Sequence, residues 1–160
     1  MKATAKFLMT LALFMATTTL SAQNTEKVSP TEVMNYLQEC GVFFLATVEA
    51  DQPHVRPFSA VTVYENHLYF LTGKKKDVFK QLKVNGKFEI CGLKRNGTEW
   101  IRITGKLIND DRVEAKQFML DKNPGNKMYS ATDNNTAVLY IQDGTATYYS
   151  FASAPRTVKF

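Results

Sequence analysis

Two short stretches decide how this chain is expected to fold: His54-Val55-Arg56-Pro57-Phe58 and Thr72-Gly73-Lys74-Lys75-Lys76. The first opens a strand predicted over residues 54–64. The second follows a strand predicted over residues 68–72 and leads into a helix predicted over residues 75–84. The expected order is therefore a strand, a turn, a second strand, and a basic loop at the start of a helix.

The basic loop and the first strand together predict a pocket for one terminal phosphate, with room for a flat ring along the strand edge. Arg56 offers a planar fork of five donors that matches an oxyanion. Thr72 adds a hydroxyl, and the free backbone N–H groups at the helix start face the same place. Lys74, Lys75 and Lys76 add point charges, although a run of lysines is more often a solvated face, which is the role assigned to Lys74.

The rest of the chain predicts a small, mainly β domain with a largely antiparallel barrel. Short apolar or alternating runs are separated by turn signals such as Asn-Gly and Asp-Gly. Three helices are expected, at residues 28–40, at residues 75–84, and from Asp110 or Asp111 to residue 122. Seven strands are expected, the last two as a hairpin through Asp143-Gly144, at residues 42–49, 54–64, 68–72, 87–93, 98–108, 137–141 and 145–151.

Residues 1–22 have the pattern of a secretory signal peptide. Lys2 and Lys6 precede a short apolar run, and small residues end at Ala22. The run is shorter than the roughly 20 residues that span a bilayer. We therefore expect cleavage near Ala22, export to the periplasm, and a mature domain of residues 23–160 that has no membrane contact. An ordinary buried N-terminus is the alternative.

Composition and motifs argue against several classes of function. The net charge of +5 falls to +3 without the leader, and no basic motif points to nucleic acid. His54 and His67 lie at turns with no second ligand at metal spacing, so no metal site is expected. The sequence contains no nucleophile motif, and no side chain is assigned a catalytic role. Cys40 and Cys91 are expected as two separate buried thiols, with pairing in an exported protein as the alternative.

Five segments between Pro30 and the last strand have a recognisable order and spacing. They read GVFFLAT at residues 41–47, PHVRPF at 53–58, LYFLTG at 68–73, KDVFKQL at 76–82 and EWIRITG at 99–105. In these segments the chain resembles the FMN-binding split-barrel family, the pyridoxamine 5′-phosphate oxidase-like superfamily. The resemblance implies an antiparallel split β-barrel with about three flanking helices, which forms a homodimer with FMN at the subunit interface.

The resemblance also implies a set of cofactor-binding residues. Arg56, Thr72 and Lys76 would hold the FMN phosphate, with Lys75 nearby. Phe58, Ser59 and Val61 would run beside the isoalloxazine ring, partly through backbone groups. Leu71 would lie next to the ribityl chain. Trp100 takes the position of a glutamine that reaches the flavin in the oxidases, and packing at an interface is its alternative role.

Two departures from the oxidases limit what is carried over. The oxidases have a lysine where this chain has Val61, and their C-terminal basic residues for pyridoxal phosphate have no clear match in the tail. Pyridoxamine phosphate oxidation is therefore not expected. The interpretation is a flavin-dependent reductase or oxidase of a small molecule, with NADH or NADPH as a transient donor and Arg102 and Arg156 as substrate contacts. The alternative is a non-catalytic FMN or haem binding protein on the same fold.

Overall fold

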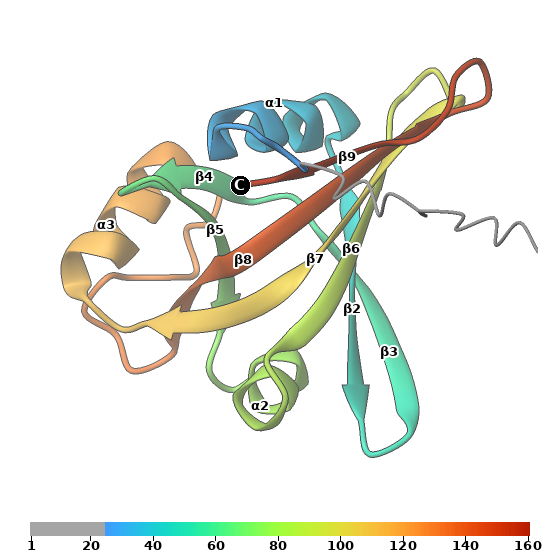
Figure 1. Ribbon diagram of the computed structural model, residues 1–160. Coiled ribbons are helices and arrows are strands. Elements are labelled where there is room, and N and C mark those ends of the chain that lie inside the picture. The colour runs from blue at the N-terminus through green and yellow to red at the C-terminus, as the bar shows by residue number, and fades with distance from the viewer. Residues whose placement is uncertain (1–24) are drawn as a thin grey trace, which may run out of the picture.

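The computed structural model describes residues 25–160 (Figure 1), so the predicted leader lies outside the described residues. Within this range the chain forms three helices, α1 (Pro30–Cys40), α2 (Asp77–Val84) and α3 (Val113–Lys122). It also forms nine strands: β1 (Glu26–Lys27), β2 (Phe43–Glu49), β3 (Gln52–Phe58), β4 (Val61–Tyr64), β5 (His67–Gly73), β6 (Lys87–Leu93), β7 (Glu99–Asp110), β8 (Thr136–Ser150) and β9 (Arg156–Lys159). None of these helices is long and apolar enough to cross a membrane.

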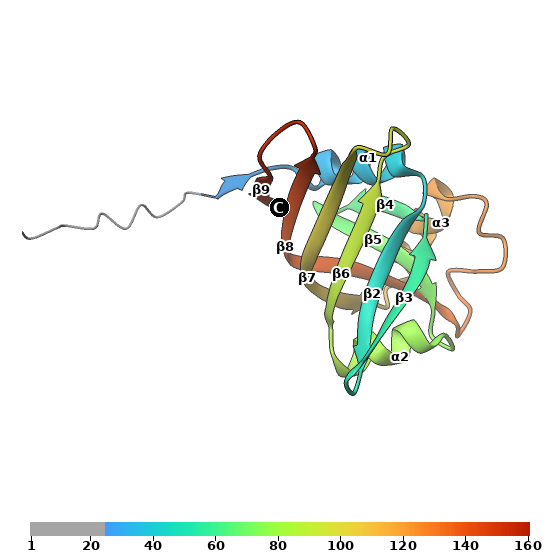
Figure 2. The ribbon, with the colours of Figure 1, turned by 90° about the vertical axis from the view of Figure 1, so that its right-hand side faces the viewer.

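The strands form one strongly curved sheet in the order β1-β9-β8-β7-β6-β2-β3, and the β4–β5 hairpin joins it through β5 and β8. All pairs are antiparallel except β1 with β9. The sheet curls until β4 and β5 lie behind β6 and β2 (Figure 2). Strands β3 and β4 do not pair with each other, so the barrel is split along this line. The predicted mainly β split barrel with three helices is confirmed.

The inner face of the barrel is filled by apolar side chains that alternate along the strands. Phe43 and Leu45 on β2, and Ile101 and Ile103 on β7, are fully buried, whereas their neighbours in sequence face outward. Helix α1 closes one end of the barrel. Ser29 caps its N-terminus and Pro30 occupies its first turn, as the sequence predicts.

The single strand predicted over residues 54–64 is wrong, because the chain forms two strands with different partners. Strand β3 pairs with β2, and β4 pairs with β5. Ser59 and Ala60 carry the chain from one side of the split to the other. Proline at residues 53 and 57 marks β3 as an edge strand, because proline has no N–H for a second ladder.

The predicted hairpin through Asp143-Gly144 is also wrong, because β8 runs continuously and pairs with β7 along both of its halves. The register shifts between Thr104 and Lys106, opposite residues 142–145. Asp143 has a φ of 54°, and Gly105 has a φ of 155°. Asp143 and Gly144 therefore lie in a β-bulge that bends β8, and the chain does not reverse its direction there.

Two further expectations need correction. Helix α3 begins after Arg112, so neither Asp110 nor Asp111 is its N-cap residue. Asp110 is buried and accepts hydrogen bonds from the Tyr69 hydroxyl and the Arg112 guanidinium. Cys91 is exposed, because it points away from the core on β6, while Cys40 is buried; both thiols are free.

We expect Gly105→Ala to destabilise the domain by about 2 kcal/mol, the usual cost of a strained backbone conformation combined with a steric clash. A Cβ at residue 105 would lie 3.0 Å from the Gln142 carbonyl oxygen, at a φ that residues with side chains rarely adopt. Urea unfolding measures the change. Gly125→Ala is the control, because nothing lies within 4 Å of its Cβ position. Equal stabilities for the two variants would contradict the bulge geometry.

Candidate functional site

A cavity of about 360 Å³ lies at the split of the barrel, between β3, the residues after it, β5 and the start of α2. Six of the nine predicted cofactor-binding residues line it: Arg56, Phe58, Ser59, Leu71, Thr72 and Lys76. Segments far apart in the sequence therefore bring a guanidinium, a hydroxyl and an ammonium group to one place. The first is on β3, the second on β5, and the third is the N-cap residue of α2.

Arg56 is held in place by a buried polar network. Its Nη1 donates to the Thr47 hydroxyl at 2.6 Å, and its Nη2 donates to the Gln81 side-chain oxygen at 2.8 Å. The Thr47 hydroxyl also donates to that same oxygen at 2.6 Å, and Gln81 Nε2 donates to Glu49. Burial lowers the pKa of Arg56, with Asp77 opposing the shift. The network leaves the Arg56 Nε–H without an acceptor among residues 25–160, so this donor is available to a ligand.

Thr72 supplies a second donor that is not used within the described chain. Its residue is 2% exposed, and its hydroxyl oxygen is buried with no hydrogen-bond partner among residues 25–160. A buried hydroxyl without a partner is costly unless a ligand satisfies it. Thr72 lines the cavity, so this hydroxyl is the donor of β5 nearest to a ligand bound there.

The loop after α3 forms the remaining wall of the cavity, through Asn126, Met128 and Tyr129. The Lys76 ammonium lies 5.7 Å from the centre of the Tyr129 ring. The sequence analysis named no residue of this loop as part of the site. The Asn-Pro-Gly turn at residues 123–125 indicates a loop, but it does not tell which side chains face the cavity.

This loop is fixed against the basic segment by two polar side chains. Asp133 accepts hydrogen bonds from the backbone N–H groups of Thr136, Asn135 and Ser130, which lower its pKa to about 2. The side-chain oxygen of Asn135 accepts a hydrogen bond from the Lys75 N–H at 3.1 Å. The backbone carbonyl of Asn135 accepts one from the Lys74 N–H at 2.6 Å. The backbone that leads into α2 is thereby positioned by the loop.

Three predicted residues lie outside this cavity. Lys75 lines an adjoining cavity of about 420 Å³, which shares Arg56 and Lys76 with the first. Val61 is buried in the core, so only its backbone faces the split. Trp100 stacks on Tyr149 with ring centres 5.1 Å apart, near the end of β7 that lies farthest from α2 (Figure 1). Within one chain, Trp100 does not join the site.

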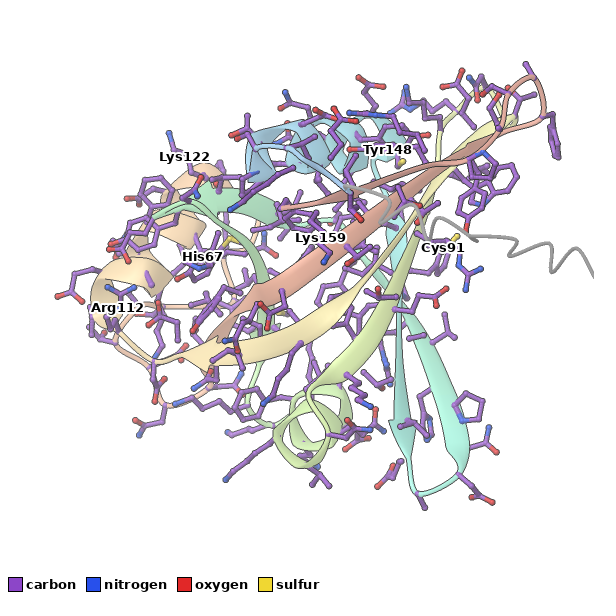
Figure 3. The ribbon with its side chains drawn as sticks, in the orientation of Figure 1. His67, Cys91, Arg112, Lys122, Tyr148 and Lys159 are labelled. Carbon is purple, nitrogen blue, oxygen red and sulfur yellow. The ribbon has the colours of Figure 1, made fainter. Side chains whose placement is uncertain are left out.

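Several arginines outside the cavity form ion pairs, among them Arg112, which is labelled beside α3 in Figure 3. Arg112 binds Glu65 and Asp110, and Arg156 binds Glu26 and Glu32, both through short ion pairs. Arg102 binds Glu89 at 2.6 Å. The two arginines considered as substrate contacts are therefore engaged in ion pairs on the surface. No group of three or more His, Cys, Asp or Glu in residues 25–160 is arranged to hold a metal ion.

Comparison with known proteins identifies the family and the fold. The family model for pyridoxamine 5′-phosphate oxidase matches residues 29–144. A solved structure of a NimC/NimA family protein from Clostridium acetobutylicum is 45% identical, with a TM-score of 0.80, and the match covers 82% of this chain and 92% of that chain. A search of the curated proteins gives no match.

Two more distant structures share the fold. One is a pyridoxamine 5′-phosphate oxidase-related, FMN-binding protein from Nostoc punctiforme, at 16% identity and a TM-score of 0.54, with 84% of this chain and 98% of that chain covered. The other is a haem-binding protein from Mycobacterium smegmatis, at 12% identity and a TM-score of 0.64, with 84% and 59% covered.

The fold and the cavity at its split define a split-barrel protein of the pyridoxamine 5′-phosphate oxidase type. The family model spans most of the described chain, and the chain therefore belongs to the pyridoxamine 5′-phosphate oxidase family. Among the solved structures of this type, the NimC/NimA family protein shares nearly half of its aligned residues with this chain.

Replacement by the isosteric residue valine is expected to change the free energy of unfolding in opposite directions at Thr72 and at Thr47. Thr72→Val removes a buried hydroxyl that has no partner, so the unliganded protein should keep its stability or gain about 1 kcal/mol. Thr47→Val removes a hydroxyl bound to Arg56 and Gln81, so it should cost about 1–3 kcal/mol. Urea unfolding of both variants without added ligand measures the difference. A larger loss for Thr72→Val would contradict this account.

Proposed function

We propose that this protein is an FMN-binding flavoprotein that acts as an oxidoreductase on a small molecule. The observation that carries the proposal is the meeting of Arg56, Thr72 and Lys76 at one cavity, where a guanidinium, a hydroxyl and an ammonium group can bind an oxyanion together. Membership of the pyridoxamine 5′-phosphate oxidase family supports it, as does the shared fold with an FMN-binding protein. The site fits a phosphate monoester with an attached ring system.

Each residue of the site would contact a different part of the bound FMN. Arg56 neutralises phosphate charge from a position fixed by Thr47 and Gln81. The Thr72 hydroxyl donates to a phosphate oxygen, and Lys76 contributes a point charge beside the N-terminus of α2. Ser59, Ala60 and their neighbours present backbone groups along the split, and Leu71 gives an apolar wall for the linking chain.

The bound flavin would supply the redox chemistry, since it accepts and delivers a hydride or single electrons. The residues that line the cavity include no histidine, cysteine or carboxylate, within the part of the chain that the structure describes. The protein's own contribution is therefore binding, orientation and exclusion of water. A nicotinamide donor would reach the ring from its open face, and the substrate would be bound there afterwards.

We also propose that the protein is a homodimer that buries the outer face of the sheet. By the strand register, Phe44, Val55, Leu93, Trp100 and Tyr149 all lie on this face. The first three are at least half exposed and lie on one face of neighbouring strands, and apolar patches of this kind mark interaction surfaces. If Trp100 contacts a flavin, the flavin is therefore that of the partner subunit.

Haem is the second candidate cofactor, on one observation: a haem-binding protein shares the fold. The residues of the cavity favour FMN, because Arg56, Thr72 and Lys76 suit a compact dianion. No histidine lines the cavity as an axial ligand, and His54 contacts Glu49 at 3.6 Å in the adjoining one. The absorbance spectrum of the protein as isolated separates a Soret band from flavin bands.

FMN should bind in a fluorescence titration, and Lys76→Ala and Thr72→Val should each weaken binding. Charge-assisted hydrogen bonds contribute about 1.5–3 kcal/mol, which corresponds to about a 10–100-fold change in Kd for a fully engaged group. Lys122→Ala removes an exposed lysine on α3 and should leave the Kd unchanged. Bleaching of the flavin band by NADH or NADPH then tests turnover. Absence of FMN binding at micromolar concentrations would remove the proposal, and binding without bleaching would leave a flavin carrier.

Phe44→Lys should convert the protein from a dimer to a monomer in analytical ultracentrifugation, because it places a charge in the centre of the proposed interface. Val113→Lys is the matched control, since Val113 on α3 is exposed to a similar extent, 48% against 50% for Phe44. A wild-type protein that sediments as a monomer, or a control that dissociates equally, would contradict the proposed interface.

A further inference from the structure

A second cavity, larger than the one at the split, lies on the other side of α2. Its volume is about 530 Å³, within the range typical of small-molecule sites. It is bounded by α2, the residues that follow it, the second half of β7, and Leu139 on β8. We refer to it as the α2–β7 groove. Among residues 25–160 it has no lining residue in common with the cavity at the split, which we refer to as the cofactor cavity.

The groove combines an apolar floor with a cationic rim. Leu82, Leu107 and Leu139 are almost fully buried and form the floor, together with Phe79 and Ile108. The rim carries Lys74, Lys83 and Lys106 and one acid, Asp111. A surface of this kind fits the apolar body and the charged end of one amphipathic molecule.

The single acid of the rim is already neutralised, so the groove has an excess of positive charge. Asp111 lies 2.7 Å from the Lys74 ammonium and 2.6 Å from that of Lys116. These two lysines lower the pKa of Asp111, which keeps it ionised and paired. Lys83 and Lys106 form no ion pair with any residue from 25 to 160. Their charges are therefore available to an anion from outside.

The backbone around the groove is closely packed, which fixes one of these two lysines. The Leu107 N–H donates to the Gly86 carbonyl at 2.8 Å. A Cβ at residue 86 would lie 3.0 Å from Lys106 Cγ and 3.1 Å from the Leu107 carbonyl oxygen. Glycine therefore lets the chain after α2 lie against β7, with the Lys106 stem along it. Lys83 at the end of α2 and Lys106 on β7 both line the groove.

We propose that the α2–β7 groove binds a small amphipathic carboxylate, with its apolar body on the Leu82–Leu107–Leu139 floor and its carboxylate between Lys83 and Lys106. Lysine suits this ligand because an ammonium is a point charge that accepts a carboxylate from many directions. A phosphate dianion would favour an arginine fork, and no arginine lines the groove. The proposal does not rest on FMN binding, because the two cavities have no lining residue in common among residues 25–160.

Calorimetric titration of the intact protein with decanoate, below its micelle concentration, tests the proposal. Saturable binding is expected, and it should weaken as salt is added. Lys83→Gln/Lys106→Gln should raise the Kd by about threefold to tenfold, the effect of losing two partly exposed ion pairs. Lys122→Gln/Lys159→Gln is the matched control: it removes the same charge from two exposed lysines that do not line the groove, and it should leave the Kd unchanged.

A second variant separates loss of the site from loss of the fold. Val84 lines the groove and is 90% exposed, so Val84→Asp places a negative charge at the rim without touching the core. It should weaken decanoate binding while unfolding remains as in the wild type. Absence of saturable binding would overturn the proposal. So would equal losses in the two double-lysine variants, or equally tight binding of neutral decanol, which would show that the carboxylate plays no part.

Discussion

The hydrogen bonds that join Thr47, Arg56 and Gln81 are the interaction on which the site depends. These residues come from β2, β3 and α2, and two of them, Thr47 and Gln81, are 5% exposed. Strand β3 is the last strand on its side of the split, so no further ladder links it to the rest of the barrel. A buried polar cluster is stabilising only when each member has its partners, and here the Gln81 oxygen accepts from both other residues. The hydrogen bonds therefore hold the edge strand β3 and the helix α2 in one arrangement. This arrangement determines the positions of Arg56 and Lys76.

The sequence predicted the parts of the structure that are encoded locally. Alternation of apolar residues identified the inner face of β7 and the existence of most strands, and Ser29 with Pro30 identified the start of α1. The predictions that were wrong depend on partners distant in sequence. Residues 54–64 have the pattern of one strand, but the first part pairs with β2 and the last part pairs with β5. Asp143-Gly144 has the composition of a turn, but continuous pairing with β7 converts it into a bulge.

The same distinction applies to the site. Arg56, Thr72 and Lys76 were found from the sequence because each lies next to a recognisable strand end or helix start, and the fold brings them to one cavity. The network behind Arg56 was not found, because Thr47 and Gln81 read as an ordinary strand residue and an ordinary helix residue. Trp100 stands on the outer face of the sheet. In the proposed dimer its relation to a cofactor would depend on the second chain, which no local pattern describes.

Helix α2 connects the features on both of its sides. It has eight residues, fewer than an isolated helix needs to be stable in water, so contacts with the barrel must hold it. Val78 faces the cofactor cavity, Gln81 faces the polar network, and Phe79 and Leu82 face the α2–β7 groove. A ligand on either side shifts the position of the helix only if it binds one position better than another. If both cavities have such a preference, each ligand changes the affinity for the other by the same factor. The short helix is thus the one element through which two separate cavities would influence each other.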